Sequence, residues 1–454
     1  MKAKEILNKL IPFTPLIIIF AVILIKPYYL FPNAGDTDFH LARAHDILLN
    51  PILGLFWDNL TYYPPGRPVW HQPLIDAVYA LMWGLGGVRF AHSFMCVLQL
   101  MLTVGVATWI ANKEYGIFAG YFAGIFALLG PLQYTLIIAI PATYIPLFAM
   151  LTIYYLPKDK KKAFIMALLG LWTHMIALVS FLPLFLVDNY KDKRNLKIIA
   201  LLLPSIIFWA GYWIYFSNRM VTLGTFYSVT HLNTIFGTTE IIGSVYSFLL
   251  VYILGIIGLY LLLKINKKQF ELILTYVTTV IVFSFFGFQG DYLRGFQFAA
   301  LPMAILSGLT VQTGYEYASH NYKPIFSSIL ILMFLLLSMV GAAIFFAQLP
   351  NQHGTGWEAI NYPFEGDYAP LKDYIEQNTS KNDVIWTESK LAEKIAWMTG
   401  RKISNGKYVG GEYGTIVGFE GQHQKINIYE SRGIILVKNI NNITIKEFRI
   451  NNGV

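Results

Sequence analysis

The chain has 454 residues, of which 56% are hydrophobic, 16% aromatic and only 13% charged. Soluble proteins average about 25% charged residues, so this composition, with a mean hydropathy of +0.51, excludes a soluble enzyme, a disordered chain and a coiled coil. Long apolar runs instead predict a polytopic membrane protein, because each span needs about 20 apolar residues. The single cysteine, Cys96, excludes a disulfide framework and a zinc-finger set.

The net charge of +8 does not indicate nucleic-acid binding once it is located along the chain. Residues 351–454 hold 12 basic and 12 acidic side chains, whereas residues 1–350 hold 22 and 14. In that first part the basic residues fall in short loops between apolar runs, which is typical of a topology signal. The predicted partner is therefore the lipid bilayer, with no nucleic acid.

The apolar runs predict an α-helical membrane domain of about eleven spans over residues 1–348. If the spans are right, 16 basic residues lie on one side of the membrane and 6 on the other. This bias predicts a multi-pass protein of the cell membrane with a cytoplasmic N-terminus and an extracytoplasmic C-terminal part. The predicted spans are 11–31, 88–111, 115–130, 136–156, 163–173, 175–189, 197–216, 241–263, 270–288, 295–314 and 324–347.

Two apolar stretches do not have the length of a single membrane span. Residues 163–189 are predicted to form two short spans that turn near Thr173 and His174, since one long span would break the charge bias. Residues 71–87 are apolar but short and carry Asp76, so we expect a helix that lies at the outer face or dips into the membrane.

Residues 349–454 change composition and predict a small extracytoplasmic α/β domain. An amphipathic helix is expected over 370–378, a strand over 383–387 and a helix over 389–399 that Gly400 stops. Alternating strands follow near 426–449.

The strongest local signal comes directly after the first span. Asp36 and His40 are four residues apart, so they share a face of a helix, with Asp38 between them and Arg43 one turn further. This pattern indicates a carboxylate cluster that holds a cation such as Mg²⁺ or Mn²⁺, or takes a proton, beside a cation that holds phosphate. The alternative is a helix start that Asp36 or Thr37 caps.

The second signal lies in the same outer loop, residues 32–87. Asp58, Tyr63 and Arg67 flank a turn made rigid by two prolines and a glycine. Aromatic residues of this kind suit a membrane interface, so the segment taken alone also fits a purely structural loop.

Together the two segments resemble the catalytic subunit of archaeal and eukaryotic oligosaccharyltransferase, and more broadly the GT-C superfamily of membrane glycosyltransferases. The resemblance implies an extracytoplasmic active site, a catalytic aspartate in the first outer loop, and a sugar donor carried on a polyprenyl phosphate such as dolichyl phosphate. Asp36 matches the catalytic position because it keeps the four-residue spacing to His40, and Asp38 is an additional carboxylate.

Two later segments match the same family. Glu240 ends an outer loop, where the family carries an acidic motif near its metal and acceptor; it could instead complement a helix dipole. Arg294 resembles the arginine that contacts the donor phosphate, although an arginine at the end of a span can also snorkel. The resemblance thus implies a divalent cation held by Asp36, Asp38 and Glu240.

The sequence also departs from that family. The Trp-Trp-Asp-Tyr-Gly signature that reads the acceptor is absent, and residues 131–146 carry no acid. The chain is therefore not expected to be a standard oligosaccharyltransferase. His174, at the turn between two short spans, fits either a helix-terminal histidine or an active-site residue.

We therefore predict a glycosyltransferase that moves a sugar from a polyprenyl phosphate to a protein, lipid or glycan acceptor on the outer face. Asp36 is the predicted base, Asp38 helps to bind a cation or the sugar, and Arg294 holds the leaving phosphate with Arg43 or Arg67. The alternatives are a transporter or flippase of lipid-linked sugars and an inactive scaffold. The clustering of acids in one outer loop, without an internal repeat, favours the enzyme over the transporter.

Overall fold

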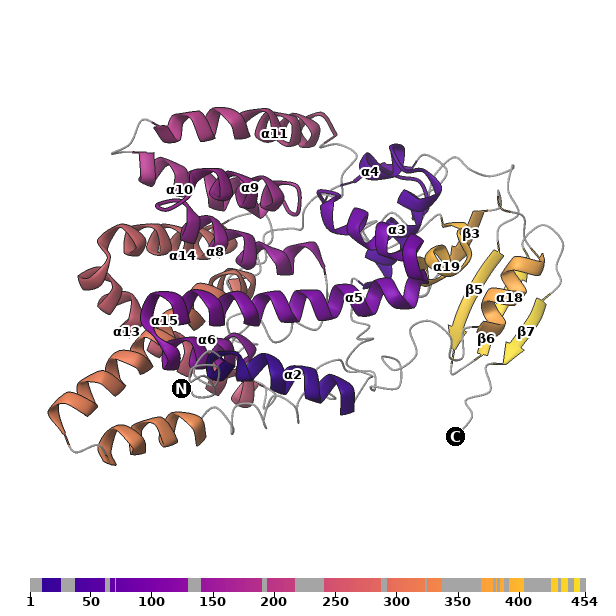
Figure 1. Cartoon of the computed structure of the whole chain (residues 1–454). Coiled ribbons are helices and arrows are strands. Elements are labelled where there is room, and N and C mark those ends of the chain that lie inside the picture. Colours follow the sequence, from indigo (N-terminus) through magenta and orange to yellow (C-terminus); the bar gives the residue numbers. More distant parts are fainter. Residues whose placement is uncertain are drawn as a thin grey trace. The chain divides into compact units, whose positions relative to one another are not determined.

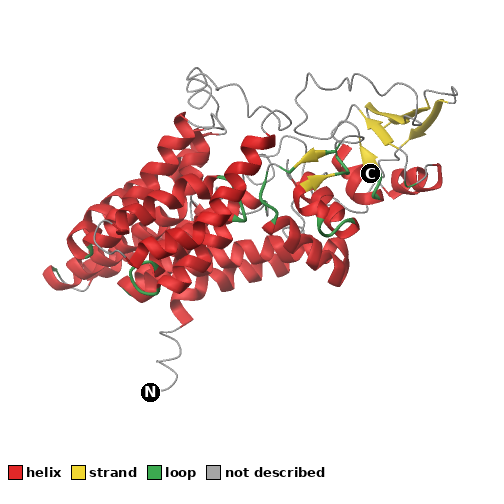
Figure 2. Ribbon diagram, turned by 90° about the horizontal axis from the view of Figure 1, so that it is seen from above, coloured by secondary structure: helices red, strands yellow, loops and turns green. Residues whose placement is uncertain are grey.

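The computed structural model is mainly helical, and its strands form one small two-stranded and one five-stranded sheet (Figure 2). It describes residues 10–25, 37–61, 66–69, 71–129, 140–189, 194–216, 241–286, 292–322, 325–336, 369–378, 381, 384–387, 392–403, 426–431, 434–439 and 445–449. By its contacts the chain divides into two compact units. The first comprises 1–30, 96–208 and 224–357, and the second comprises 31–95, 209–223 and 358–454.

The first unit is a helical bundle (Figure 1), in which α15 contacts several other helices. This helix packs against α6, α8, α13 and α14, and α9 and α10 lie beside α8. The bounds are α2 Thr14–Ile25, α6 Ile117–Leu129, α8 Ile145–Tyr155, α9 Lys160–Leu171, α10 Ile176–Asn189, α13 Ile241–Ile265, α14 Lys267–Phe286, α15 Tyr292–Asn321 and an apolar helix Ile325–Leu336; the 3₁₀ turns Ile11–Phe13 and Pro141–Tyr144 precede α2 and α8.

Two helices contribute to both units. Helix α5, Leu74–Tyr115, has non-helical backbone angles at Gly87, where the predicted short helix and the following span meet. Helix α11 runs from Arg194 to Phe216. Among the described residues, three helices are long and apolar enough to cross a membrane: Leu74–Tyr115, Lys197–Phe216 and Gly295–Asn321. The count of eleven spans stays a prediction.

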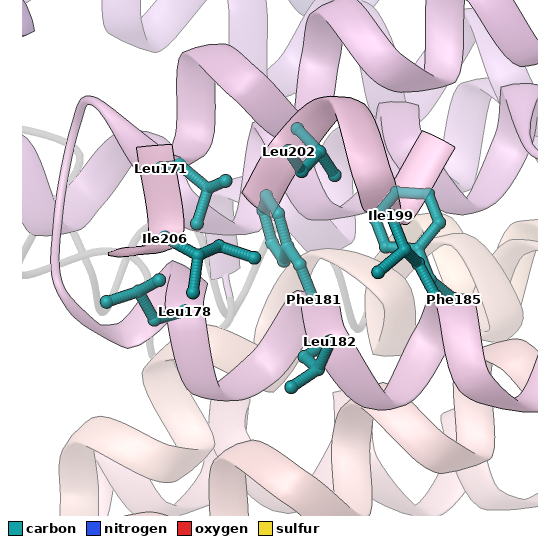
Figure 3. Close-up of a pocket in the computed structure, with 8 residues that line it drawn as sticks. All are labelled: Leu171, Leu178, Phe181, Leu182, Phe185, Ile199, Leu202 and Ile206. Carbon is teal, nitrogen blue, oxygen red and sulfur yellow. The ribbon is translucent and has the colours of Figure 1, made fainter. Parts of the chain in front are cut away.

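The predicted turn inside 163–189 is confirmed as a break between two helices. Helix α9 ends at Leu171 and α10 begins at Ile176. With α11 these helices enclose a pocket lined only by leucine, isoleucine and phenylalanine side chains, among them Phe181 and Leu202 (Figure 3). No side chain of its lining can bind a charged headgroup.

The second unit combines the first loop with the C-terminal residues. Its elements are α3 Thr37–Leu49, α4 Leu53–Phe56, α18 Ala369–Asn378 and α19 Ala392–Thr399, with strands β1 Trp57–Asp58, β2 Arg67–Pro68, β3 Val384–Thr387, β4 Lys402–Ile403, β5 Ile426–Ser431, β6 Ile434–Asn439 and β7 Ile445–Arg449. The large sheet has the order β4-β3-β5-β6-β7, with β3 parallel to β4 and β5. Helix α19 ends at Gly400, whose φ of 66° is the left-handed helix stop that the sequence predicted.

Close packing of α13 on α15 depends on small residues. Ser307 Oγ and Thr310 Oγ1 each donate a hydrogen bond of 2.7 Å to a backbone carbonyl of α13, at Val251 and Leu254. A Cβ added at Gly258 would overlap the backbone carbonyl of Leu306. Small residues allow this approach, as in membrane helix pairs.

We therefore expect Gly258→Ala to lower the thermal unfolding temperature of the detergent-purified protein, because overpacking a tight contact costs about 1–3 kcal/mol. Gly211→Ala in α11 is the matched control, since nothing lies within 4 Å of its added Cβ and alanine favours a helix. Equal unfolding temperatures for the two variants would contradict this packing.

Candidate functional site

Helix α3 carries the residues of the strongest sequence signal. It begins at Thr37, directly after Asp36, and Asp38 lies in its first turn, where a carboxylate complements the helix dipole. His40 and Arg43 follow and are buried, with 2% and 0% exposure. Of the other predicted site residues, Asp36, Tyr63 and Glu240 lie outside the described residues, as does the side chain of Arg294.

Two arginines and two aspartates form a buried, charge-balanced network behind α3. Arg43 Nη1 donates to Asp46 Oδ2 at 2.8 Å and lies 3.6 Å from Asp58 Oδ1. Arg67 Nε donates to Asp58 Oδ2 at 3.0 Å. No side chain of the four is more than 6% exposed. Burying ions is costly unless they are paired and hydrogen-bonded. Each of the four ions is paired and hydrogen-bonded here, and of the Arg43 nitrogens only Nε has no partner among the described residues.

The turn around Asp58 explains why the sequence folds in this way. In the β1–β2 pair Asp58 lies opposite Arg67. The backbone N–H of Thr61 donates to Asp58 Oδ1 at 2.9 Å, and its hydroxyl donates to Oδ2. Gly66 has a φ of 63°, and a Cβ there would overlap the indole nitrogen of Trp57. The turn therefore requires glycine at position 66, directly before Arg67. Its hydrogen bonds converge on the carboxylate of Asp58.

Burial and the neighbouring charges shift the pKa values of three residues of the network. Burial alone would raise the pKa of Asp58, but attraction to Arg67 and then Arg43 outweighs burial and lowers it. Burial would lower the pKa of Arg43, but attraction to Asp58 and Asp46 raises it. Burial raises the pKa of Asp46 by more than Arg43 lowers it. The Asp58 contribution to stability is thus present above the usual aspartate pKa and is lost as pH falls through the lowered folded value.

Asp38 contacts α19 in the C-terminal part of the same unit. Its Oδ1 accepts a 2.8 Å hydrogen bond from Trp397 Nε1, and its Oδ2 lies 3.9 Å from Lys394 Nζ. His45, two turns further along α3, donates from Nδ1 to the Trp397 carbonyl at 2.8 Å. Burial lowers the pKa of His45, so the neutral imidazole that makes this contact is favoured. These contacts favour an anchoring role for Asp38.

His40 is paired with an acid that the sequence did not identify as a site residue. Its Nδ1 lies 2.8 Å from Asp76 Oδ1, and both side chains are at most 3% exposed. The His71 ring lies 5.4 Å from the His40 ring, centroid to centroid. A carboxylate on one imidazole nitrogen fixes the tautomer and the ring orientation. An acid within an otherwise apolar short helix was the signal for Asp76 in the sequence.

The described contacts of His174, Arg43 and Arg67 are with other parts of the protein itself. His174 lies in the first unit, where its Nδ1 accepts a 3.3 Å hydrogen bond from the backbone N–H of Ile176 at the start of α10. Arg43 and Arg67 are engaged in the network, so their contacts favour a structural role, and their predicted contact with donor phosphate is untested.

The predicted divalent cation is also untested. Within the part of the chain that the structure describes, no three His, Cys, Asp or Glu side chains form a group that could hold a metal ion. Of the three residues predicted to hold Mg²⁺ or Mn²⁺, only Asp38 is described.

No family model matches the sequence, and no curated protein matches it. Solved structures do match. The Archaeoglobus fulgidus oligosaccharyltransferase is 10% identical, with a TM-score of 0.57, over 84% of this chain and 62% of its own. ArnT from Cupriavidus metallidurans is 12% identical, with a TM-score of 0.53, over 86% of this chain and 85% of its own.

These likenesses show the fold. The chain has a GT-C-like fold, as the sequence predicted, and spans about 62% of the archaeal oligosaccharyltransferase. The three described helices that are long and apolar enough to cross a membrane, with the apolar composition of the chain, indicate an integral membrane protein.

Asp58→Asn is expected to destabilise the second unit by about 3–5 kcal/mol, because it keeps the shape but leaves two buried arginines with one carboxylate fewer. Glu114→Gln is the control, since its partner Lys158 is 39% exposed and such a pair is worth about 1 kcal/mol or less. Denaturant unfolding in detergent would measure both. If Asp58→Asn unfolds like the control, the network does not support the fold.

Proposed function

We propose that the chain is a membrane glycosyltransferase that takes its sugar from a polyprenyl phosphate, such as dolichyl phosphate. The observation that carries this proposal is the shared fold. An archaeal oligosaccharyltransferase of 12% identity was solved with a dolichol-phosphate and an inhibitory peptide, and ArnT of 13% identity with undecaprenyl phosphate. The acceptor would be a protein, lipid or glycan on the extracytoplasmic face, with the N-terminus of the chain in the cytoplasm.

Asp36 is our proposed base. It directly precedes α3, which is held by the ion network, by α19 and by the His40–Asp76 pair. In the reaction the acceptor atom forms a bond to C1 of the sugar while the C1–O bond to phosphate breaks. The proton of the acceptor passes to the Asp36 carboxylate, and the bonding electron pair leaves with the phosphate.

Arg294 is our proposed contact for the departing phosphate. Its backbone lies in the first turn of α15, a helix of 30 residues, and a helix N-terminus favours a phosphate. A guanidinium adds two donors in a fork that matches phosphate oxygens. Glu240 and Tyr63 remain proposed contributors to cation and substrate binding, and Asp38 supports the site through α19.

We expect Asp36→Asn to fold and bind the lipid donor like the parent but to transfer sugar at least about a hundredfold more slowly, since a positioned base contributes about 10²–10⁴-fold. Asp38→Asn should be milder. Asparagine caps a helix as well as aspartate does, so a role limited to capping α3 predicts near-normal turnover. Transfer assays on equally folded variants decide between the two roles, and full activity in Asp36→Asn removes this residue from the mechanism.

Arg294→Ala is expected to weaken use of the polyprenyl-phosphate sugar far more than Arg219→Ala. A lost charge-assisted hydrogen bond to phosphate is worth about 1.5–3 kcal/mol, or about tenfold or more. Binding of dolichyl phosphate to the two purified variants measures the difference. Equal losses would remove Arg294 from the phosphate site.

A further inference from the structure

A polar cluster next to the ion network is only partly satisfied. Gln72 is fully buried, and neither its amide oxygen nor its amide nitrogen has a hydrogen-bond partner among the described residues. Asp76 is 1% exposed, and its Oδ2 is likewise without a partner there, while its Oδ1 binds His40. Leaving such groups unpaired costs about 1–3 kcal/mol each. A ligand that forms hydrogen bonds with them would remove this cost.

These groups lie in one small region of the first loop. His71 precedes Gln72 directly, and its ring is 5.4 Å from that of His40. Asp76 follows Gln72 by four residues and binds the same His40 at 2.8 Å. The helical backbone bonds of this segment already begin at Pro73, whose carbonyl accepts from Ala77 N at 2.8 Å. Gln72 thus stands in the sequence between two residues whose side chains both lie next to His40.

The chemistry of the unpaired atoms selects the class of partner. The Asp76 carboxylate is itself one of the unpaired groups and repels an anion, so a phosphate does not fit. A cation would satisfy the oxygens but leave the amide N–H groups of Gln72 unmet. Exchanging the positions of the amide oxygen and nitrogen of Gln72 would not alter this conclusion, because both atoms lack a partner among the described residues. A hydroxyl both donates and accepts, and neighbouring hydroxyls of a sugar supply both functions at once.

We propose that Gln72 and Asp76 bind hydroxyl groups of the sugar on the lipid-linked donor. This inference rests on the proposed function and extends it, because it assigns residues to the sugar of the donor in addition to its phosphate. A bound water offers the same hydroxyl chemistry, so the test must distinguish a sugar from a water that stays in place.

The experiment measures the affinity of the full, detergent-purified chain for dolichyl phosphate, dolichyl phosphate glucose and dolichyl phosphate mannose by thermal shift. The parent should bind at least one sugar-bearing lipid more tightly than dolichyl phosphate. Gln72→Met keeps the length of the side chain and removes the unpaired amide. It should unfold at the same or a higher temperature without ligand, and bind dolichyl phosphate normally. Its affinity for the preferred sugar lipid should fall about three- to tenfold.

Gln269→Met is the matched control. Gln269 is 3% exposed, but its Oε1 accepts from Tyr115 Oη at 3.4 Å, and its backbone N–H binds Asn266. This variant should lose thermal stability and keep the preference for the sugar lipid. The contrast separates the loss of a buried amide in general from the loss of the Gln72 subsite.

Three results would overturn the inference. If Gln72→Met is less stable and keeps the sugar preference, the amide serves the fold through a bound water. If the parent prefers neither sugar lipid over dolichyl phosphate, there is no sugar subsite, although the proposed lipid donor stands. If the parent binds none of the three lipids, the proposed function itself fails and the sugar subsite fails with it.

Discussion

The buried pairing of Asp58 with Arg67 and Arg43 is the interaction on which the first loop depends. Asp58 joins three pieces of chain: its own turn through Thr61, the opposite strand through Arg67, and α3 through Arg43. With Asp46 the four charges sum to zero, so each ion is compensated at the place where it is buried. Replacing any one member by a neutral residue leaves an uncompensated buried charge, which is strongly destabilising.

The same helix is held from two further directions. Asp38 and His45 attach α3 to α19, and His40 attaches it to α5 through Asp76. Each contact is a hydrogen bond of 2.8 Å between buried or partly buried groups. A catalytic side chain must be held close to its working geometry, which requires such support from a second layer of residues. Asp36, our proposed base, immediately precedes α3 in the sequence, so we propose that this support serves it.

The sequence predicted local features of the fold well. Apolar runs predicted helices that the structure describes, such as α6, α13 and α14; the charge bias predicted the break between α9 and α10, and Gly400 predicted the end of α19. Long-range partners could not be predicted. Asp38 and Trp397 are 359 positions apart, and nothing local relates them. For Arg43 and Arg67 the sequence shows a cation without its partner, so it predicts a phosphate contact and not the buried ion network; the phosphate contact itself stays a prediction. Asp46, three residues after Arg43, was the local hint of an internal ion pair.

The two polar clusters of the first loop differ in one respect that bears on function. In the ion network, each carboxylate oxygen of Asp46 and Asp58 has a partner within the described residues. Around Gln72 and Asp76 three polar atoms have none there. An unpaired buried polar group destabilises the fold, and an apolar residue of similar size in its place would be neutral or stabilising. Proteins break the rule of polar satisfaction mainly at functional sites. Arg43 Nε also has no partner there, but both carboxylates of the network are fully engaged, which fits a structural role. At Gln72 and Asp76 the unpaired atoms are the ones to which we propose that a sugar binds.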